Sequence, residues 1–497
     1  MIEVFTDVAC TVCGCVCDDL TVTVDAGRVV RSERACRLAE PWFLGQSAGQ
    51  PASAAFDDAV SRAAELLSAA RNPLIYGLSR STTEGQRAAT ALADRLGATI
   101  DTTASTGHAP SILALQQVGE STCTLGEVAN RADLVIFWGS DPVVTHPRHL
   151  ERYSADPVGR FVPEGRAGRH VVVVDVAETE TAKVADRFVR VDLLVGPGAR
   201  DGTPAVDLDF GLPACVAGRM SAMQTSSGGG AGPNFRLFSD GGERASTAMA
   251  FQARAQWSAE QPSRRGGLGR ASPSPCSNGI DSAENAPAGL LQQVWDEGRL
   301  PALRELAARM KACRFGVIFF GGGLVKGPHA HRTIEALLQL VTDLSRHTRF
   351  YARRMRRYGD VAGADSVLAW QTGYPFGVNL ARGYPRYNPG EFTGPEMLSR
   401  GEADCCLLVG SGTVADFPPA ALDHLRRIPV IALDPPGAEP PVPATVRFTT
   451  AVYGVHRPGT AYRMDEVPIP LRVLLPTSLP SDADVLTAIL GRIPGSG

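Results

Sequence analysis

The sequence lacks several features that would place it in a specialised class of protein. None of its apolar runs approaches the roughly 20 residues that a membrane-spanning helix needs. Its first residues, Met1 to Val4, include neither the basic and apolar regions of a secretory signal nor a twin-arginine start. The net charge of −3 provides no general attraction to nucleic acid or to an anionic membrane. We therefore expect a cytoplasmic protein that binds neither nucleic acid nor membrane.

Composition and length indicate an ordinary soluble, globular protein of several domains. Hydrophobic residues make up 44% and charged residues 20% of the 497 positions. A chain of this length exceeds what one core can accommodate, so two or three domains are expected. Eleven cysteines are present, five of them within the first 36 residues. Without an export signal, this concentration of thiols indicates metal chemistry rather than a disulfide framework.

Four cysteines near the N-terminus have the spacing of ligands to one inorganic centre. Cys10, Cys13 and Cys17 follow the pattern C-x2-C-x3-C, and Cys36 comes 19 residues later. Thiolates are soft ligands that suit an iron–sulfur cluster or zinc, and one such centre takes four of them. The C-x3-C arm is less usual for zinc sites, whose arms are mostly C-x2-C. Free or disulfide-paired cysteines are the alternative interpretation.

The residues around these cysteines favour a convergent arrangement. Gly14 is expected to allow a tight backbone turn that directs the first three thiols inward. Residues 20–24 and 28–31 have the composition of short strands on either side of a turn at 25–27, which predicts a hairpin. The hairpin would return Cys36 to the other three ligands, and Cys15 would be a spare thiol.

From about residue 53, apolar strands alternate with amphipathic helices. The expected strands are 73–77, 99–100, 132–138, 170–175, 315–320, 405–412 and 429–434, and the expected helices are 58–70, 86–96, 288–311 and 331–345. Continuous apolar strands separated by helices predict an α/β fold with doubly wound parallel sheets. Ligands bind at the carboxyl ends of such strands, so the candidate loops follow Gly77, Asp101, Trp138 and Asp175.

Composition also suggests domain boundaries. The expected parts are a cysteine-bearing domain at 1–52, an α/β domain at 53–195, an insertion at 196–288 and a second α/β region at 289–497. The insertion is dominated by Gly, Ser, Pro and Ala without apolar periodicity, which predicts a poorly ordered segment. Cys215 and Cys276 lie in it without ligand spacing and are assigned no role. Cys405 and Cys406 fall on a predicted strand, where buried packing is expected.

A cysteine motif ahead of a large α/β body resembles the molybdopterin oxidoreductases, and in particular the B subunit of formylmethanofuran dehydrogenase. The matching stretches cover the chain in order outside the insertion, at 10–19, 101–105, 126–133, 146–149, 373–375, 385–391 and 459–464. The resemblance implies a molybdopterin-oxidoreductase-like fold with a small N-terminal iron–sulfur domain. It also implies a [4Fe-4S] cluster on Cys10, Cys13, Cys17 and Cys36, and a molybdenum or tungsten bis(pterin guanine dinucleotide) centre that interconverts CO2 and formate.

The sequence departs from this family at the position of the metal ligand. The family holds its molybdenum or tungsten with a cysteine or selenocysteine directly before a histidine, but here Gly107 precedes His108. Glycine has no donor atom and cannot supply the soft thiolate. Thr106 offers only a hydroxyl, and Cys123, 16 residues away, is expected to belong to the core.

A second departure follows the predicted strand that ends at Asp175. The family usually has a proline and an arginine there, and the arginine suits the phosphates of the pterin nucleotide, whereas this chain has Val176 and Ala177. His108 and Arg356 still match catalytic positions of the family, although structural hydrogen bonds would also explain them. The two losses together predict that the site for the molybdenum or tungsten bis(pterin guanine dinucleotide) is degenerate.

This combination is similar to the B subunit of the bacterial formyltransferase/hydrolase complex. That resemblance implies a non-redox scaffold subunit in one-carbon metabolism with methanopterin-type and methanofuran-type carriers. The implied partners are an amidohydrolase-like A subunit, a C subunit and a formyltransferase D subunit. Two alternatives remain open. One is an active molybdenum or tungsten formylmethanofuran (formate) dehydrogenase subunit in which another donor replaces the thiolate. The other is an electron-transfer or formate-binding module that uses only the cluster.

Overall fold

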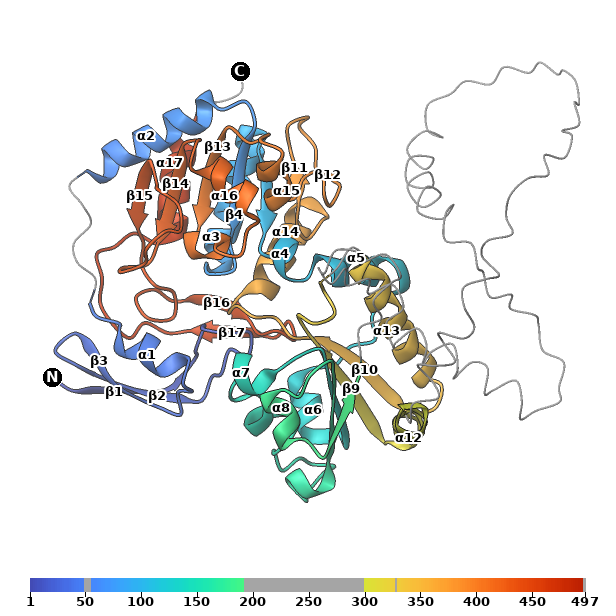
Figure 1. Cartoon of the computed structure of the whole chain (residues 1–497). Helices are drawn as coiled ribbons and strands as arrows, with labels where there is room; N and C mark the ends of the chain where they lie inside the picture. Colours follow the sequence, from blue (N-terminus) through green and yellow to red (C-terminus); the bar gives the residue numbers. More distant parts are fainter. Residues whose placement is uncertain (49–54, 192–298, 327–328, 495–497) are drawn as a thin grey trace, which may run out of the picture. The chain divides into compact units, whose positions relative to one another are not determined.

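Two sheets, each assembled from strands far apart in the sequence, form the body of the protein in this computed structural model (Figure 1). The structure describes residues 1–48, 55–191, 299–326 and 329–494. The predicted insertion at 196–288, with Cys215 and Cys276, lies outside the described residues, as does the first part of the helix predicted at 288–311. Within the described residues, no helix combines the length and apolarity needed to cross a bilayer.

The smaller of the two sheets is wholly parallel, with strand order β10-β9-β6-β7-β8. Its strands are β6 (Leu134–Trp138), β7 (His170–Asp175), β8 (Arg187–Arg190), β9 (Phe315–Phe320) and β10 (Arg349–Arg354). Helices α6 (Leu125–Arg131) and α8 (Glu180–Val184) pack on one face. Helices α12 (Arg299–Ala312) and α13 (Ala330–Leu344) connect and flank the later strands. The central strands are apolar on both faces, as expected of a buried parallel sheet.

The larger sheet has the order β12-β11-β5-β4-β13-β14-β15. Its strands are β4 (Pro73–Gly77), β5 (Thr99–Thr102), β11 (Val378–Asn379), β12 (Arg386–Tyr387), β13 (Cys405–Val409), β14 (Val430–Asp434) and β15 (Val446–Thr449). All pairs are parallel except those made by the short edge strands β11 and β12. The α/β class with parallel sheets, predicted from the apolar runs, is confirmed.

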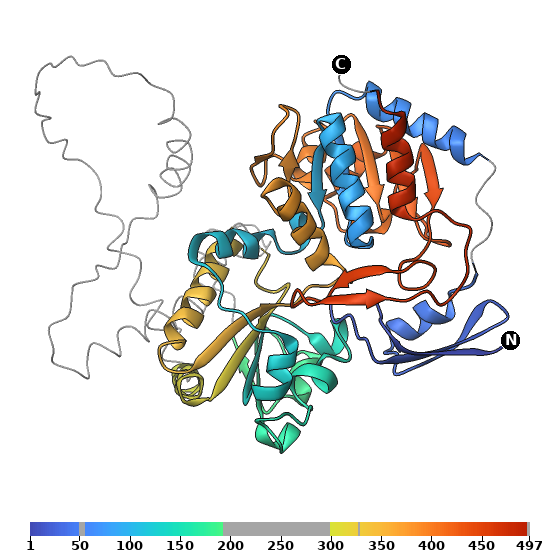
Figure 2. The same ribbon diagram turned by 180° about the vertical axis from the view of Figure 1, so that it is seen from behind.

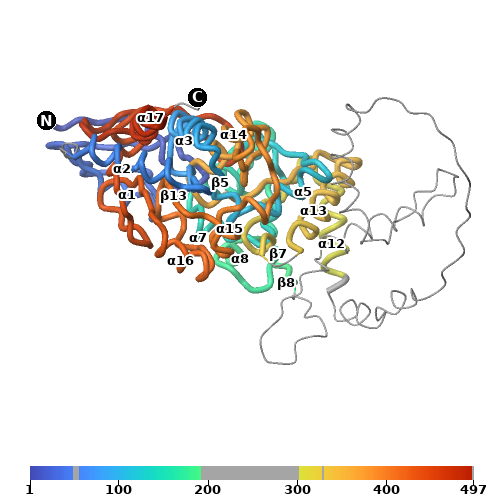
Figure 3. The backbone as a smooth tube through the Cα atoms, turned by 90° about the horizontal axis from the view of Figure 1, so that it is seen from above, coloured from blue at the N-terminus to red at the C-terminus, as the bar shows by residue number. Residues whose placement is uncertain are grey.

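Helices cover both faces of the larger sheet. Helices α2 (Phe56–Ala69), α3 (Thr83–Leu96) and α17 (Asp482–Arg492) pack on one face, and α15 (Gly394–Ser399) and α16 (Pro419–Leu425) on the other. In Figure 2, α3 and α17 lie side by side against the sheet, and Figure 3 shows both next to α2. Cys405 packs with the first group and Cys406 with the second, so the predicted packing role of both is confirmed.

A small antiparallel sheet forms the N-terminal part. It contains β1 (Glu3–Val8), β2 (Leu20–Asp25) and β3 (Arg28–Glu33), followed by α1 (Ala39–Leu44). The hairpin predicted between residues 20 and 31 is confirmed, with left-handed φ values of +46° at Ala26 and +74° at Gly27 in the turn. Strand β1 was not predicted, because its side chains are largely exposed and carry little apolar pattern.

The sheets do not follow the sequence ranges 53–195 and 289–497. Strands from both ranges pair within each sheet, for example β4 with β13 and β6 with β9. Parallel strands need crossover connections, so neighbours in a sheet need not be neighbours in sequence. The elements that were not predicted include α4 (Ala104–Gly107), α5 (Ala109–Val118), α7 (Pro142–Thr145), α14 (Val361–Thr372), β10, β16 (Gly459–Tyr462) and β17 (Pro468–Leu471).

Candidate functional site

Residues 10–17, here called the cysteine loop, connect β1 to β2. The amide of Cys10 donates to the carbonyl of Cys17 at 2.7 Å, which closes the loop on itself. Cys10, Cys13 and Cys17 are buried, whereas Cys36, just beyond β3, is partly exposed. The first three predicted ligands therefore lie in one closed and buried loop.

Gly14 is needed for a reason other than the predicted turn. Its φ is not left-handed, and the left-handed residue of the loop is Val16, with φ of +36°. A Cβ atom on Gly14 would lie 2.4 Å from the backbone oxygen of Arg356, a separation that side chains do not adopt. The predicted turn is present, because the amide of Val16 donates to the carbonyl of Cys13 at 3.1 Å, but it does not itself require a glycine. The glycine is required because two backbone segments approach closely there.

The thiols of the cysteine loop influence one another's ionisation. Burial and the charges of the other three predicted ligands raise the pKa of Cys10 well above that of a free thiol. The pKa of Cys17 is lowered to about 7, chiefly by a hydrogen bond from Cys15, with nearby arginines also contributing. Hydrogen bonds to Cys13 and Cys17 raise the pKa of Cys15. Cys15 therefore acts as a protonated donor beside a more acidic Cys17.

The predicted ligands are not grouped as they would be around a single metal ion. Among the residues that the structure describes, no three His, Cys, Asp or Glu side chains are close enough together to hold one ion. Around a single zinc ion, with Zn–S bonds of about 2.3 Å, sulfur atoms would lie about 3.8 Å apart. The cysteine loop does not have this tight arrangement.

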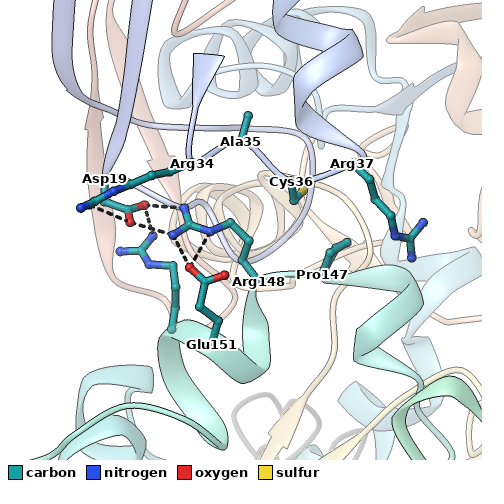
Figure 4. Close-up of a pocket in the computed structure, with 9 residues that line it drawn as sticks. Asp19, Arg34, Ala35, Cys36, Arg37, Pro147, Arg148 and Glu151 are labelled. Atoms are coloured by element: carbon teal, nitrogen blue, oxygen red, sulfur yellow. Dashed lines mark hydrogen bonds and ion pairs between the residues drawn. The ribbon is translucent and has the colours of Figure 1, made fainter. Parts of the chain in front are cut away.

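A pocket of about 570 Å³ opens beside Cys36, which is the one predicted thiol ligand among its lining residues (Figure 4). Arg148 extends along its wall and pairs with both carboxylate oxygens of Asp19, at 2.7 and 2.8 Å. The same guanidinium contacts Glu151 at 2.6 Å. Arg152 pairs with Asp18 at 2.8 Å. The arginines of this wall thus connect Asp18 and Asp19, directly after the cysteine loop, to the segment that follows α7.

The loop that carries Gly107 follows β5 and includes the short helix α4. Gly107 is exposed, and a Cβ atom placed on it would have no other atom within 4 Å. The next residue, His108, is buried. Its Nε2 lies 2.7 Å from Oδ2 of Asp365, and the other oxygen of Asp365 accepts from Oγ1 of Thr102 at 2.9 Å. His108 is therefore held by hydrogen bonds in the protein interior, whereas the preceding residue, Gly107, is exposed.

The two other possible donors named from the sequence do not replace the missing thiolate. Oγ1 of Thr106 donates to the carbonyl of Thr103 at 3.2 Å and lies 3.2 Å from the hydroxyl of Tyr76. Cys123 is buried in the core beside the smaller sheet, and burial raises its pKa to about 12. It is thus a neutral core thiol, as predicted.

Arg356 lies in the segment between β10 and α14 and is buried. Its Nη2 is 3.3 Å from Oε1 of Glu466. Its Nε and Nη1 are buried and have no hydrogen-bond partner within the described residues. Burial, together with the charge of Arg354, lowers the pKa of Arg356 to about 10. A buried cation with unused donors is suited to a small anion.

His108 and Arg356 are brought together in one polar cluster. Burial lowers the pKa of His108, and the positive charges of Arg356 and Arg354 lower it further, whereas Asp365 acts to raise it. The imidazole is therefore neutral near pH 7, beside a charged guanidinium. The structure thus places both predicted catalytic residues in the same region, without assigning either of them a reaction.

The loop after β7 contains no cation at the position where the family has its arginine. The amide of Val176 donates to the carboxylate of Asp175 at 2.7 Å, and burial raises the pKa of Asp175. Val176 itself is exposed. The carboxylate of Asp175 is therefore hydrogen-bonded within the loop, and the apolar side chain of Val176 faces solvent.

A second pocket lies at the carboxyl ends of the larger sheet, where ligands were expected. Arg80, Gly410 and Pro435 line it from the loops after β4, β13 and β14, and Asp482 lines it from the start of α17. The carboxylate of Asp434 faces inward instead, accepting from the amide and hydroxyl of Ser411 at 2.8 and 2.7 Å.

Sequence reasoning missed three residues that contact His108 or Arg356: the buried Asp365 and His146 and the exposed Glu466. Asp365 and Glu466 are polar residues in segments without a motif, and each meets its partner more than 100 positions away. His146 stands in the His-Pro-Arg-His stretch at 146–149, which the sequence marks only as a family match. That stretch was the one signal that could have led to it.

No protein-family model matches the chain. Over almost its full length, however, the chain is similar to two archaeal proteins. It is 34% identical over 509 residues to the B subunit of the tungsten-containing formylmethanofuran dehydrogenase 2 of Methanocaldococcus jannaschii, covering 99% of each chain. It is 32% identical to the protein of the same name from Methanococcus maripaludis, again covering 99% of each chain.

Shorter or more distant similarity links the chain to a bacterial complex. It is 31% identical over 110 residues to the B subunit of the formyltransferase/hydrolase complex Fhc of Methylorubrum extorquens, covering 22% of this chain and 29% of that protein. The crystal structure of FhcABCD from the same organism, in complex with methylofuran, contains a chain with a TM-score of 0.57 and 22% identity. The match covers 89% of this chain and 96% of that chain, and it concerns the fold alone.

Proposed function

This chain belongs to the family of formylmethanofuran dehydrogenase B subunits, and on that premise we propose that it is a non-redox scaffold subunit of a formyltransferase/hydrolase complex. The observation that carries the proposal is Gly107. At the position where the family resemblance implies a metal-binding thiolate, this chain has an exposed glycine with open space around it. The residues present therefore do not fit a molybdenum or tungsten bis(pterin guanine dinucleotide) bound through a cysteine.

The surroundings of Gly107 support the same conclusion. His108 is tied to Asp365, so its retention needs no catalytic explanation. Cys123 is a protonated core thiol, and the loop after Asp175 has no arginine for pterin phosphates. The chain thus keeps the framework of the family without the groups that hold the heavy metal.

The four cysteines, by contrast, fit a [4Fe-4S] cluster. Such a cluster takes one thiolate on each iron, so its sulfur ligands stand farther apart than those around one zinc ion. The buried loop with three thiols, and Cys36 near enough to affect the pKa of Cys10, supply the four thiols that such a cluster needs. The lowered pKa of Cys17 favours the thiolate form that iron needs. When bound, the cluster would supply one-electron transfer or structural support.

The proposed complex includes partners named for the relatives. We propose that this chain assembles with an amidohydrolase-like A subunit, a C subunit and a formyltransferase D subunit, as the name FhcABCD suggests for the bacterial complex. Formyl transfer and hydrolysis would take place in those partners, in one-carbon metabolism with methanopterin-type and methanofuran-type carriers. Abundant free thiols support a reducing, cytoplasmic location.

The competing function is that of an active molybdenum or tungsten formylmethanofuran dehydrogenase subunit. Both full-length relatives carry tungsten in their names. For this chain, that function would require a donor other than a side chain at position 107, such as water or hydroxide. Gly107 therefore stands against it.

The test is an activity assay of the purified native complex under anaerobic conditions. A scaffold role predicts release of formate from the formyl carrier but no formyl-dependent reduction of a viologen dye. Removal of this subunit should break up the complex, as measured by its native mass. Dye reduction that disappears in the H108A variant would instead establish the competing redox function.

A further inference from the structure

The segment from Met355 to Asp360 passes against the cysteine loop at two points of backbone contact. A Cβ atom on Gly14 would lie 2.4 Å from the backbone oxygen of Arg356. A Cβ atom on Gly359 would lie 2.0 Å from the backbone oxygen of Thr11. Only glycine permits such proximity, so the two segments cannot move independently.

His146 holds the same carbonyl group from another direction. Its Nε2 donates to the backbone oxygen of Arg356 at 2.7 Å, and its Nδ1 lies 2.8 Å from Oγ1 of Thr145. The ring is buried, and burial lowers its pKa to about 4, so the imidazole is neutral. The backbone of Arg356 is thus fixed between the cysteine loop and the loop after β6.

The cysteine loop also holds the segment that carries the ion-pair partner of Arg356. The amide of Met464 donates to the carbonyl of Gly14 at 2.8 Å, and Glu466 follows two residues later. Glu466 has a left-handed φ of +66°, a conformation that non-glycine residues rarely adopt. Gly14 therefore contacts both segments whose side chains meet at the Arg356–Glu466 pair.

The Arg356 side chain projects two buried, unpartnered donors, Nε and Nη1. Its pair with Glu466 uses only Nη2, and Arg354 nearby is engaged with Glu120 at 3.0 Å. These two donors lie on different edges of the guanidinium, so each can donate one hydrogen bond to a small anion such as a carboxylate if the position of the guanidinium is fixed.

We propose that Gly14 and His146 position Arg356, so that the cysteine loop controls how well the buried guanidinium binds a small carboxylate such as formate. A change in the cysteine loop displaces the Arg356 carbonyl and, with it, the two unpartnered donors. Because coupling between two sites is reciprocal, a bound carboxylate also favours the ordered cysteine loop. The part played by the cluster rests on the proposed function, whereas positioning by His146 does not.

The test measures formate binding to the anaerobically purified complex by titration calorimetry at constant ionic strength. H146F removes the hydrogen bond to Arg356 and keeps an aromatic ring, so the dissociation constant should rise at least about ten-fold. H146Q places an amide donor close to the original Nε2 and should recover most of the affinity. If His146 had only a structural role, H146Q would not recover the affinity for formate while H146F and H146Q kept the melting temperature of the wild type.

Two control variants define the limits of this measurement. R356M removes the guanidinium and should abolish binding. H149F changes the other buried histidine of the same stretch, which bonds Oγ of Ser154 at 3.0 Å and makes no hydrogen bond to Arg356. It should bind formate within about two-fold of the wild type.

The outcomes separate this inference from the proposed function. Wild-type affinity in H146F, or no formate binding by the wild-type complex, would overturn the inference. Removal of iron by a chelator should weaken formate binding in the wild type. If the complex contains no iron and H146F still weakens binding, the positioning role stands and the proposed cluster is wrong.

Discussion

The cysteine loop and the loop around Gly107 differ in whether they contain the metal-binding residues that the family resemblance implies. The cysteine loop keeps its predicted ligands, three of them buried within a closed turn of chain, and Cys36 follows in the sequence. The Gly107 loop keeps its histidine but has no sulfur to offer. His108 persists in contact with Asp365, and that contact stabilises the fold whether or not a metal is present. The resemblance at the Gly107 loop therefore includes the histidine but not the residue expected to bind the metal.

The glycines of the two loops show the same contrast. Gly14 is enclosed, with another backbone oxygen occupying the place of its side chain. Gly107 is surrounded by open space. The first glycine is required by packing, whereas the second leaves room for the side chain that the family resemblance implies. Four predictions test this comparison, in order of expected effect.

The largest effect is expected in the cysteine loop, which contains three of the four predicted cluster ligands. C13A removes one of the four proposed cluster ligands, so the variant should lose its iron, its acid-labile sulfide and its visible absorbance. The measurement is metal analysis together with absorption spectroscopy of the purified protein. C123A makes the same chemical change at a core thiol and should leave the spectrum intact. An unaltered spectrum in C13A would refute the ligand assignment.

The second prediction concerns the residue that supports His108. D365A leaves the imidazole and the hydroxyl of Thr102 without their buried partner, so the free energy of unfolding should fall by about 3 kcal/mol. Denaturant unfolding of the full chain measures this loss. The control D423A breaks an exposed pair with Arg426 and should cost less than about 1 kcal/mol. Equal losses would show that the His108–Asp365 pair is not structurally important.

The third prediction compares two carboxylates whose surroundings shift their pKa values in opposite directions. Beside the cysteine loop, Arg148 and Arg152 overcome the effect of burial and lower the pKa of Asp19. After the Arg356 segment, burial raises the pKa of Asp360 to about 8, although it accepts hydrogen bonds from Tyr462 and two other groups. The folded state therefore holds a proton on Asp360 that the unfolded state releases near its ordinary pKa of about 4.

Since the folded state binds the extra proton, the contribution of Asp360 to stability is lost as pH rises from about 4 to about 8. The D360N variant cannot ionise, so its free energy of unfolding should decline less steeply over this range. The difference in slope should approach about 1.4 kcal/mol per pH unit. Denaturant unfolding at several pH values measures it, and parallel slopes for the two proteins would contradict the assignment.

The smallest effect is expected at Gly107. G107C introduces a thiol where no atom lies within 4 Å, so stability should change by no more than about 0.5 kcal/mol. G14A, in contrast, forces a Cβ atom against the Arg356 carbonyl and should cost about 1–3 kcal/mol. Thermal unfolding of both variants makes the comparison. A G107C variant as damaged as G14A would mean that the position is not open.

Much of the scaffold could be predicted because its signals are local. The strands at 73–77 and 315–320 are unbroken apolar runs, and the hairpin turn at 25–27 has its own composition. Strand β10 was missed because its sequence, Arg-Phe-Tyr-Ala-Arg-Arg, contains arginines that become buried only through distant partners. Propensity cannot anticipate such partners.

In the candidate site, too, local features could be predicted from the sequence, whereas contacts between distant residues could not. The cysteine spacing and the glycine before His108 are visible in the sequence. The support of His108 by Asp365, and of the Arg356 backbone by His146, joins residues more than 200 positions apart. Nothing local marks those contacts. The turn at Gly14 was predicted, but the close approach that requires a glycine there was not, because the atom concerned belongs to Arg356.

Quantitative metal analysis of the native complex tests the central contrast most directly, because one sample reports on both loops. The account predicts about four iron and about four acid-labile sulfide per chain, with tungsten and molybdenum far below one atom per chain. Tungsten or molybdenum close to one atom per chain would contradict it, since a heavy metal would then be held without the thiolate that Gly107 cannot provide.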